Sequence, residues 1–452
     1  MPRPVLFFLV LIALFNVSRV LREPGLTNSD RPMDFRTCYV GQAVLRQGQN
    51  PYDDATLKRG WQRIVAAEQL VSRTEPGLPN LPFLYPPWAV ALFGLTVGQL
   101  AYALAWPLWG ALAVLCLLAT ARWWPALSKA ESAPGIPWWH LLIFAFALKG
   151  TVPALLTGQP TFLALALGVG ALAVAQLNES PAAGPGTRPD GQQATSQPRL
   201  LQAAGGSWRP VAAGALLGLA AFKVTLLLPF VAWFVWKKQW RSLLVAAAVV
   251  ALLSAVAWQW AAAPSELLPT YRHLLAQVRA QSFDPADPDY PLTQGMTLRL
   301  ELGNVLEWLR PGSSTWHVLL HGLLWLGAGL RLAWLHRQGQ RVAGWWLFLV
   351  VSTLTLLTTY HLYYDAVLLL PLLAFAARLP GRLRLLLPVL LLPLLLPLNG
   401  LAQALGNPVA LQWVYFLMPL SLLGVLGLLL SWPVDRASRQ NDLRTSRHDF
   451  FI

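Results

Sequence analysis

The segments MDFRTCYVGQAVLRQGQNPYDD (residues 33–54) and FLYPPW (residues 83–88) decide how this chain is built. They bound a polar stretch, residues 34–87, that follows one apolar helix and precedes a long series of apolar runs. The stretch begins with an acid, Asp34, beside the first apolar run. A large polar loop with a carboxylate next to the membrane indicates chemistry at the boundary between lipid and water.

The composition outside this loop is typical of a membrane protein. Of 452 residues, 56% are hydrophobic and only 12% are charged, which is about half the charged fraction of a soluble globular protein. The formal charge of +14 does not indicate nucleic-acid binding, because Arg and Lys lie mainly between apolar runs and in the tail, as topology signals do. Cys38 and Cys116 fall in different environments, so we expect no disulfide and no metal site.

The apolar stretches predict an all-α polytopic membrane protein with twelve crossings, since a span needs about 20 apolar residues. We expect the first run to be a retained helix, because Asn-Val-Ser-Arg (residues 16–19) is a poor signal-peptide cleavage site. The stretch 210–236 has an alternative, two short helices that meet near Lys223, in which case the stretch 85–121 has one crossing fewer. The predicted spans are residues 4–21, 85–100, 101–121, 138–156, 160–178, 210–236, 240–261, 314–335, 342–360, 361–377, 383–400 and 408–432.

Basic clusters orient these spans, because Arg and Lys favour cytoplasmic loops. Each cluster of the second half is separated from the next by two crossings, so all of them fit the cytoplasmic side. The loops 22–84 and 262–312 then lie outside. Within the second loop, residues 264–280 have the apolar periodicity of a helix that lies on the membrane.

The chain therefore divides into four parts. Residues 179–209 are rich in Gly, Pro, Ser, Gln and Ala and predict a flexible linker, since they cannot bury enough apolar surface to fold. The other parts are an N-terminal transmembrane module with the external catalytic loop 22–84 (residues 1–178), a C-terminal module with the external loop 262–312 (residues 210–435) and a basic cytoplasmic tail (residues 436–452).

Asp34 is the first candidate for catalysis. Partial desolvation beside the membrane raises the pKa of a carboxyl group and makes it a better base near neutral pH. Such a base takes a proton from a sugar or lipid hydroxyl. The alternative is that Asp34 only caps a helix over residues 35–48. We interpret Asp53 and Asp54 as caps of a helix over residues 55–73.

Three further residues could contact an anion. Lys223 lies far from both polar ends of its run, where a bare cation costs roughly 2.5–3.5 kcal/mol, so it needs an anionic partner or a wet cavity. A phosphate meets this need, and snorkelling near a short helix end is the alternative. Arg299 either clamps a phosphate or completes an amphipathic helix. His361, among three Tyr and one Asp, indicates a polar site or a hydrogen-bonded turn.

Two short motifs have both a structural and a ligand-binding interpretation. Tyr85 precedes two prolines and a Trp, a pattern that begins a helix at the membrane surface or contacts a ligand. Gln159, in Thr-Gly-Gln-Pro, either forms a tight turn or meets a polar substrate. No Walker loop, His-Glu-x-x-His motif or dinucleotide fingerprint occurs in a suitable context, so nucleotide-driven transport lacks support.

The order of these motifs resembles glycosyltransferase family 87 of the GT-C superfamily, which includes mycobacterial polyprenol-phosphate-mannose-dependent mannosyltransferases. Thr293-Gln294-Gly295 departs from an Asn-Gln-Ser-like segment that the family often has. The resemblance rests on Asp34-Phe35, Gly48-x-x-Pro51-Tyr52, Phe83-x-Tyr85-Pro86-Pro87, Gly158-Gln159, the Gly-rich run that ends in Lys223, the distal Arg299 and His361-x-Tyr363-Tyr364.

The resemblance implies a multi-pass enzyme of the bacterial plasma membrane with its active site on the external, periplasmic face. It would move a hexose, with mannose as the first candidate, from a polyprenyl phosphate to a lipid or glycan hydroxyl with inversion. We expect no cofactor, and no metal because no acidic cluster is suited to hold one, and we expect a monomer whose partners are the lipid donor, the acceptor and membrane lipids. The implied roles are general base for Asp34, donor-phosphate contacts for Lys223, Arg299 and His361, and substrate-pocket contacts for Tyr52, Tyr85, Gln159 and Tyr364.

Two other classes of protein stay open. A flippase or polymerase for lipid-linked oligosaccharides would also keep cations in a membrane cavity, but it does not need a large ordered first loop with an acid beside the membrane. A secondary transporter would favour internal repeats with paired broken helices. The two halves of the chain show no clear repeat.

Overall fold

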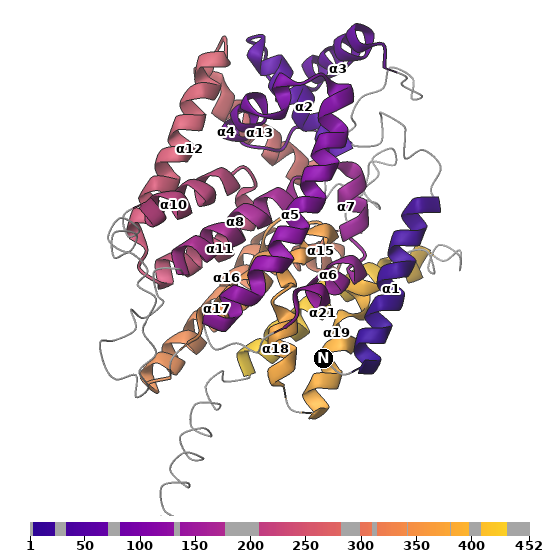
Figure 1. Cartoon of the computed structure of the whole chain (residues 1–452), viewed down its shortest axis with the longest axis vertical. Coiled ribbons are helices and arrows are strands. Elements are labelled where there is room, and N and C mark those ends of the chain that lie inside the picture. The colour runs from indigo at the N-terminus through magenta and orange to yellow at the C-terminus, as the bar shows by residue number, and fades with distance from the viewer. Residues whose placement is uncertain are drawn as a thin grey trace, which may run out of the picture.

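The computed structural model describes residues 3–22, 33–70, 82–130, 136–176, 208–281, 299–309, 314–340, 342–379, 381–396 and 408–431. Within these ranges every regular element is a helix, and strand-like pairing is confined to two isolated bridges. The all-α prediction is therefore confirmed for this part of the chain. The helices form an elongated bundle in which α2, α3, α4 and α13 gather at one end (Figure 1).

The helices of the N-terminal half are α1 (Arg3–Arg22), α2 (Met33–Arg46), α3 (Asp54–Glu68), α4 (Pro87–Leu95), η1 (Val97–Gln99), α5 (Tyr102–Ala130), α6 (Trp138–Ala147), α7 (Thr151–Thr157) and α8 (Thr161–Gln176). Those of the C-terminal half are α10 (Trp208–Ala220), α11 (Val224–Trp236), α12 (Trp240–Trp260), α13 (Pro264–Gln281), α15 (Gly303–Leu309), α16 (Ser314–Arg337), α17 (Gly344–Thr358), η2 (Tyr363–Leu369), α18 (Leu372–Arg378), α19 (Gly381–Leu395) and α21 (Pro408–Ser431).

Three of the described helices, α5, α12 and α16, are long and apolar enough to cross a membrane. The pair α6 and α7, bent by 77°, makes a fourth if it is one broken span. The structure is thus that of a helical membrane protein, whereas twelve crossings stay a prediction. Part of the difference arises because some apolar stretches are broken, as between α10 and α11, and others form apolar helices of only 10–17 residues.

Helix breaks within apolar stretches place polar groups inside the bundle. The stretch 210–236 forms two helices, α10 and α11, with Lys223 between them, which confirms the two-helix alternative. Small residues let α10 pack closely on α12: a Cβ atom at Gly214 would lie 2.4 Å from the Ser242 carbonyl oxygen. Such contacts between small residues and a neighbouring backbone are typical of helices packed in membranes.

The first polar loop contains two ordered helices. Asp53 is the N-cap of α3 and accepts a hydrogen bond from the Thr56 backbone nitrogen at 2.9 Å, which confirms its interpretation as a cap. Asp54 occupies the first turn of α3. Asp34 lies in the first turn of α2, which begins at Met33 and so starts earlier than predicted. In the second loop α13 matches the predicted amphipathic helix over residues 264–280.

Several sequence predictions fall outside the described residues. These are the tail 436–452, the segment Thr293–Gly295 and all of the linker 179–209 except residues 208 and 209, which begin α10. Both cysteines are buried and free, as expected.

Gly158 fixes the turn between α7 and α8, and Gly158→Ala is predicted to destabilise the protein. The residue has φ +70°, and a Cβ atom there would lie 2.5 Å from the Phe35 Cβ atom. A left-handed conformation costs a non-glycine residue roughly 1–2 kcal/mol before any clash. Thermal unfolding in detergent should show a lower transition temperature and lower activity, because the turn carries Gln159. Gly110→Ala in α5, where nothing lies within 4 Å, is the control and should be neutral; equal effects of the two substitutions would contradict this account.

Candidate active site

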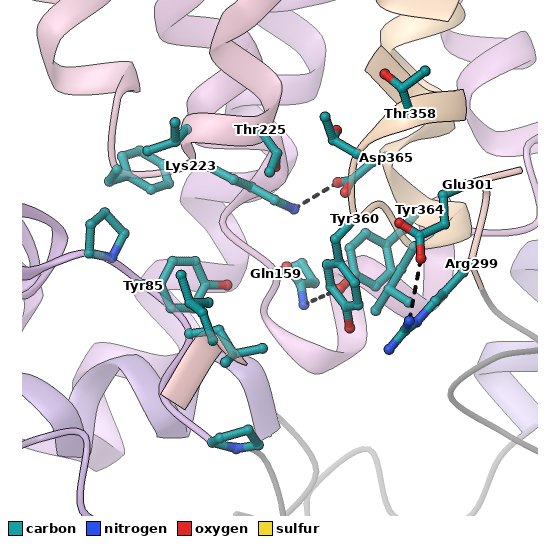
Figure 2. A pocket seen from close by; sticks show the side chains of 18 of the residues that line it. Tyr85, Gln159, Lys223, Thr225, Arg299, Glu301, Thr358, Tyr360, Tyr364 and Asp365 are labelled. Carbon is teal, nitrogen blue, oxygen red and sulfur yellow. Dashed lines mark hydrogen bonds and ion pairs between the residues drawn. The ribbon is translucent and has the colours of Figure 1, made fainter. Parts of the chain in front are cut away.

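The described part of the chain contains a cavity of about 820 Å³, and residues of both polar loops contribute to its walls. Segments far apart in the sequence supply its walls (Figure 2). The polar or ionisable lining residues are Asp34, Thr37, Tyr85, Trp88, Gln159, Lys223, Thr225, Tyr271, Arg299, Glu301, His317, His321, Thr358, Thr359, Tyr360, Tyr364 and Asp365.

Asp34 reaches this cavity because its neighbour Phe35 anchors the start of α2. The Phe35 ring is fully buried and lies 5.5 Å from the Trp109 ring and 5.9 Å from the Trp106 ring, centroid to centroid. Burial raises the pKa of Asp34 above its ordinary value of 3.8. Thr157, Gln159 and the positive charge of Lys223 oppose this rise. The outcome is a carboxyl group that binds a proton more readily than one in water.

A buried polar network surrounds Lys223. Its Nζ atom donates to Asp365 Oδ1 at 2.7 Å and to the Thr161 hydroxyl. The Thr161 hydroxyl donates to the same carboxylate oxygen at 2.9 Å. The other carboxylate oxygen lies 2.9 Å from His361 Nδ1. The anionic partner that Lys223 requires is therefore Asp365, and His361, which is fully buried behind it and does not line the cavity, orients that carboxylate.

Gln159 and Tyr364 connect Asp34 with Lys223, since Gln159 interacts with the Asp34 carboxyl group. The Gln159 amide nitrogen donates to the Tyr364 hydroxyl at 2.7 Å, and Lys223 Nζ lies 5.0 Å from the centre of the Tyr364 ring. The backbone approaches closely here, because a Cβ atom at Gly150 would lie 2.5 Å from the Tyr364 Cα atom. These contacts link the turn between α7 and α8, η2 and the break between α10 and α11.

The Tyr-Pro-Pro-Trp segment closes another wall. Trp88 donates its indole N–H to the Ala221 carbonyl oxygen at 3.0 Å, which ties α4 to the break beside Lys223. Tyr52 donates to the Tyr85 carbonyl oxygen at 3.0 Å but does not line the cavity. Its ring packs against Phe83 and Tyr271 instead. Tyr52 therefore supports the wall that Tyr85 presents.

Arg299 lines another part of the cavity wall and has an acidic neighbour, Glu301. Its Nη1 atom lies 3.4 Å from Glu301 Oε1, and its guanidinium carbon lies 4.6 Å from the centre of the Tyr360 ring. The sequence analysis did not select Glu301. The signal for it was the spacing of two residues, which places both side chains on one face of an extended segment.

The structure brings most of the predicted site residues together. Those that line the cavity are Asp34, Lys223, Arg299, Tyr85, Gln159 and Tyr364, and those that lie behind its wall are Tyr52 and His361. Lining residues that the sequence analysis did not propose as site residues include Asp365, Glu301, His317 and His321. Within the described residues, no three His, Cys, Asp or Glu side chains are placed to hold a metal ion.

The arrangement suits transfer of a group from an anionic leaving oxygen to a hydroxyl oxygen. It offers a carboxyl group with a raised pKa, a cation held by a buried carboxylate and walls with many apolar side chains. Base catalysis and charge stabilisation at a departing oxygen require these parts.

The comparisons with known proteins agree with this chemistry. Neither the curated proteins nor the solved structures gave a significant match to the chain. The model of glycosyltransferase family 87 matches residues 83–359, which is more than half of the 452 residues. The match includes most of the cavity wall, although Asp34 and Asp365 lie beyond its ends. The chain therefore belongs to glycosyltransferase family 87 and is a membrane glycosyltransferase.

Proposed function

We propose that this enzyme transfers a hexose, with mannose as the first candidate, from a polyprenyl phosphate to a hydroxyl of a lipid or glycan acceptor. The observation that carries the proposal is the cavity itself, which contains Asp34 and Lys223 within one partly apolar space. A carboxyl group with a raised pKa and a cation are the two groups that this reaction requires. The proposal also agrees with the family of the chain.

Asp34 is the general base in this mechanism. The acceptor hydroxyl oxygen attacks the anomeric carbon while its proton passes to the Asp34 carboxylate. The bond between the anomeric carbon and the phosphate oxygen breaks, and its electron pair leaves with the phosphate. A single displacement inverts the anomeric configuration. The phosphate departs as an anion, so it needs a nearby positive charge rather than an acid.

Lys223 supplies that charge. Its side chain is 11% exposed, whereas that of Asp365 is 3% exposed, so the cation is the more accessible member of this pair. His361 acts indirectly, because it orients Asp365, which in turn holds Lys223. This replaces the direct phosphate contact expected for His361 with a positioning role.

Apolar side chains of the cavity wall suit the prenyl chain of the donor. Val224 of α11, Leu275 of α13 and Val318 of α16 line the cavity, and all three side chains are exposed. These three apolar side chains from three helices are the surface against which we place the prenyl chain. An apolar contact of this kind keeps the hydrocarbon away from water while the phosphate meets the polar part of the cavity.

The cavity belongs on the external face of a bacterial plasma membrane in this proposal. His317, which lines the cavity, lies near the first turn of α16, whereas Arg331 and Arg337 lie near its other end. Since basic residues favour the cytoplasmic side, the cavity end of α16 faces outward. The enzyme acts there as a monomer.

The direct test is product formation. Purified protein incubated with radiolabelled polyprenyl-phosphate mannose and a membrane lipid extract should transfer the label to an acceptor lipid or glycan, with inverted configuration by NMR. Glucose and galactose donors run in parallel identify the hexose. Movement of intact lipid-linked sugar across vesicles, without any transfer, would favour the flippase alternative instead.

The rate of transfer is predicted to rise with pH through a single ionisation of Asp34. Because burial raises the pKa of this group, the midpoint should lie above 3.8. The base is active when ionised, so activity is complete above its folded-state pKa and is lost as the pH falls through it. A pH–kcat profile measures this, and Asp34→Asn should lack the acidic limb. A midpoint at or below 3.8, or the same limb in the variant, would assign the ionisation to another group.

A further inference from the structure

The segment that carries Arg299 is an extended segment that lies against the end of α17 and the residues that follow it. The Leu300 backbone nitrogen donates to the His361 carbonyl oxygen at 2.9 Å, and the Leu302 nitrogen donates to the Leu357 carbonyl oxygen at 2.9 Å. The side chains of Leu300 and Leu302, on one face of this segment, are buried. Alternation along an extended chain then places the side chains of residues 299 and 301 on the opposite face, which is the cavity wall.

The two ion pairs of the cavity differ in which partner is the more exposed, the cation or the carboxylate. At the first pair Lys223 is more exposed than Asp365, with side-chain exposures of 11% and 3%. At the second pair the carboxylate is the more exposed partner, since Glu301 is 13% exposed and Arg299 only 6%. An anionic phosphate is favoured beside the first pair and disfavoured beside a carboxylate. The two pairs therefore fit different parts of the donor. The Lys223–Asp365 pair fits the phosphate, and the Arg299–Glu301 pair fits another part.

Glu301 has the properties of a group that binds hydroxyls. An ionised carboxylate accepts several hydrogen bonds, and Arg299 both neutralises it and adds donors at its side. Arg299 is itself fixed between Glu301 and the face of the Tyr360 ring, so the pair is held in place before a ligand binds. Figure 2 shows Tyr360 between this pair and the Lys223–Asp365 pair.

We infer that Glu301 is a specificity residue that accepts hydrogen bonds from ring hydroxyls of the transferred hexose, while Arg299 positions its carboxylate. This inference rests on the proposed function and refines it, because it moves Arg299 from the phosphate to the sugar. The phosphate stays with Lys223. A sugar bound this way would be selected by the positions of its hydroxyl groups.

Binding of two short-chain lipids separates these assignments. The probes are prenyl phosphate and prenyl-phosphate mannose, titrated in detergent against wild type, Glu301→Gln and the control Glu266→Gln, which changes an exposed glutamate of α13. Wild type and the control should bind the mannosyl lipid more tightly than the sugar-free lipid. In Glu301→Gln that preference should fall by about 10- to 100-fold, the range for a hydrogen bond to a charged group. Affinity for prenyl phosphate should stay the same or rise.

Glu301→Asp keeps the charge of the pair and provides a second variant should Glu301→Gln unfold. It should bind prenyl phosphate as wild type does and lose part of the preference for mannose. The inference would be overturned if Glu301→Gln and Glu301→Asp both kept the full preference for the mannosyl lipid. It would also be overturned if either variant lost affinity for prenyl phosphate. If wild type bound both lipids equally, the sugar subsite alone would be refuted. If it bound neither, the proposed function would fail as well.

Discussion

Asp34→Asn is expected to reduce sugar transfer by about 10²- to 10⁴-fold, the range for loss of a general base. An amide has nearly the shape of the carboxyl group but accepts no proton from the acceptor hydroxyl. The fold should be retained, because burial disfavours the charge that the substitution removes. Phe35, which anchors this turn of α2, is unchanged.

The measurement is kcat with saturating donor and acceptor, together with the thermal transition of each protein. Asp54→Asn is the matched control, since Asp54 is an exposed acid in the first turn of α3 whose partner is Lys58 at 3.1 Å. Exposed ion pairs contribute little to stability, so this variant should behave as wild type. An active Asp34→Asn enzyme would show that another group takes the proton.

Lys223→Ala is expected to have the second largest effect, on donor use and on stability together. Without the ammonium group the departing phosphate loses a charged hydrogen-bond donor, and the donor KM should rise by about 10- to 100-fold. Asp365 is then a buried carboxylate without its cation. Breaking a buried pair in this way costs about 3–5 kcal/mol.

A double variant separates these two effects. Lys223→Ala combined with Asp365→Asn removes both charges, so the thermal transition should recover towards that of wild type while the donor KM stays high. Steady-state kinetics with donor and acceptor varied in turn, and calorimetry in detergent, supply the measurements. An equal loss of donor and acceptor use, or a double variant as unstable as the single one, would mean that Lys223 has a structural role only.

The sequence predicted most of the local structure because the signals are local. The cap at Asp53 and the amphipathic helix of residues 264–280 follow from short-range patterns, and the structure contains both. The number of membrane crossings was harder to predict. Apolar composition alone does not show that Lys149 and Gly150 bend one stretch by 77°, or that Lys223 divides another.

The candidate site was predictable as single residues but not as pairs. Lys223 was recognised as a cation that needs a partner, yet its partner Asp365 lies 142 residues away and no local pattern connects them. Thr161 joins the same carboxylate across 204 residues. His361 was selected as a direct ligand because its neighbours are polar. Only the fold shows that it lies behind Asp365.

The central claim is that one cavity holds both reactants with Asp34 beside the acceptor hydroxyl, and a density map of the enzyme with bound prenyl-phosphate mannose tests it most directly. We predict the phosphate within hydrogen-bonding distance of Lys223 Nζ, the mannose against Glu301 and the Asp34 carboxyl group on the side of the anomeric carbon opposite the phosphate. A lipid phosphate bound elsewhere, or an Asp34 side chain that no acceptor can reach from this cavity, would contradict the account.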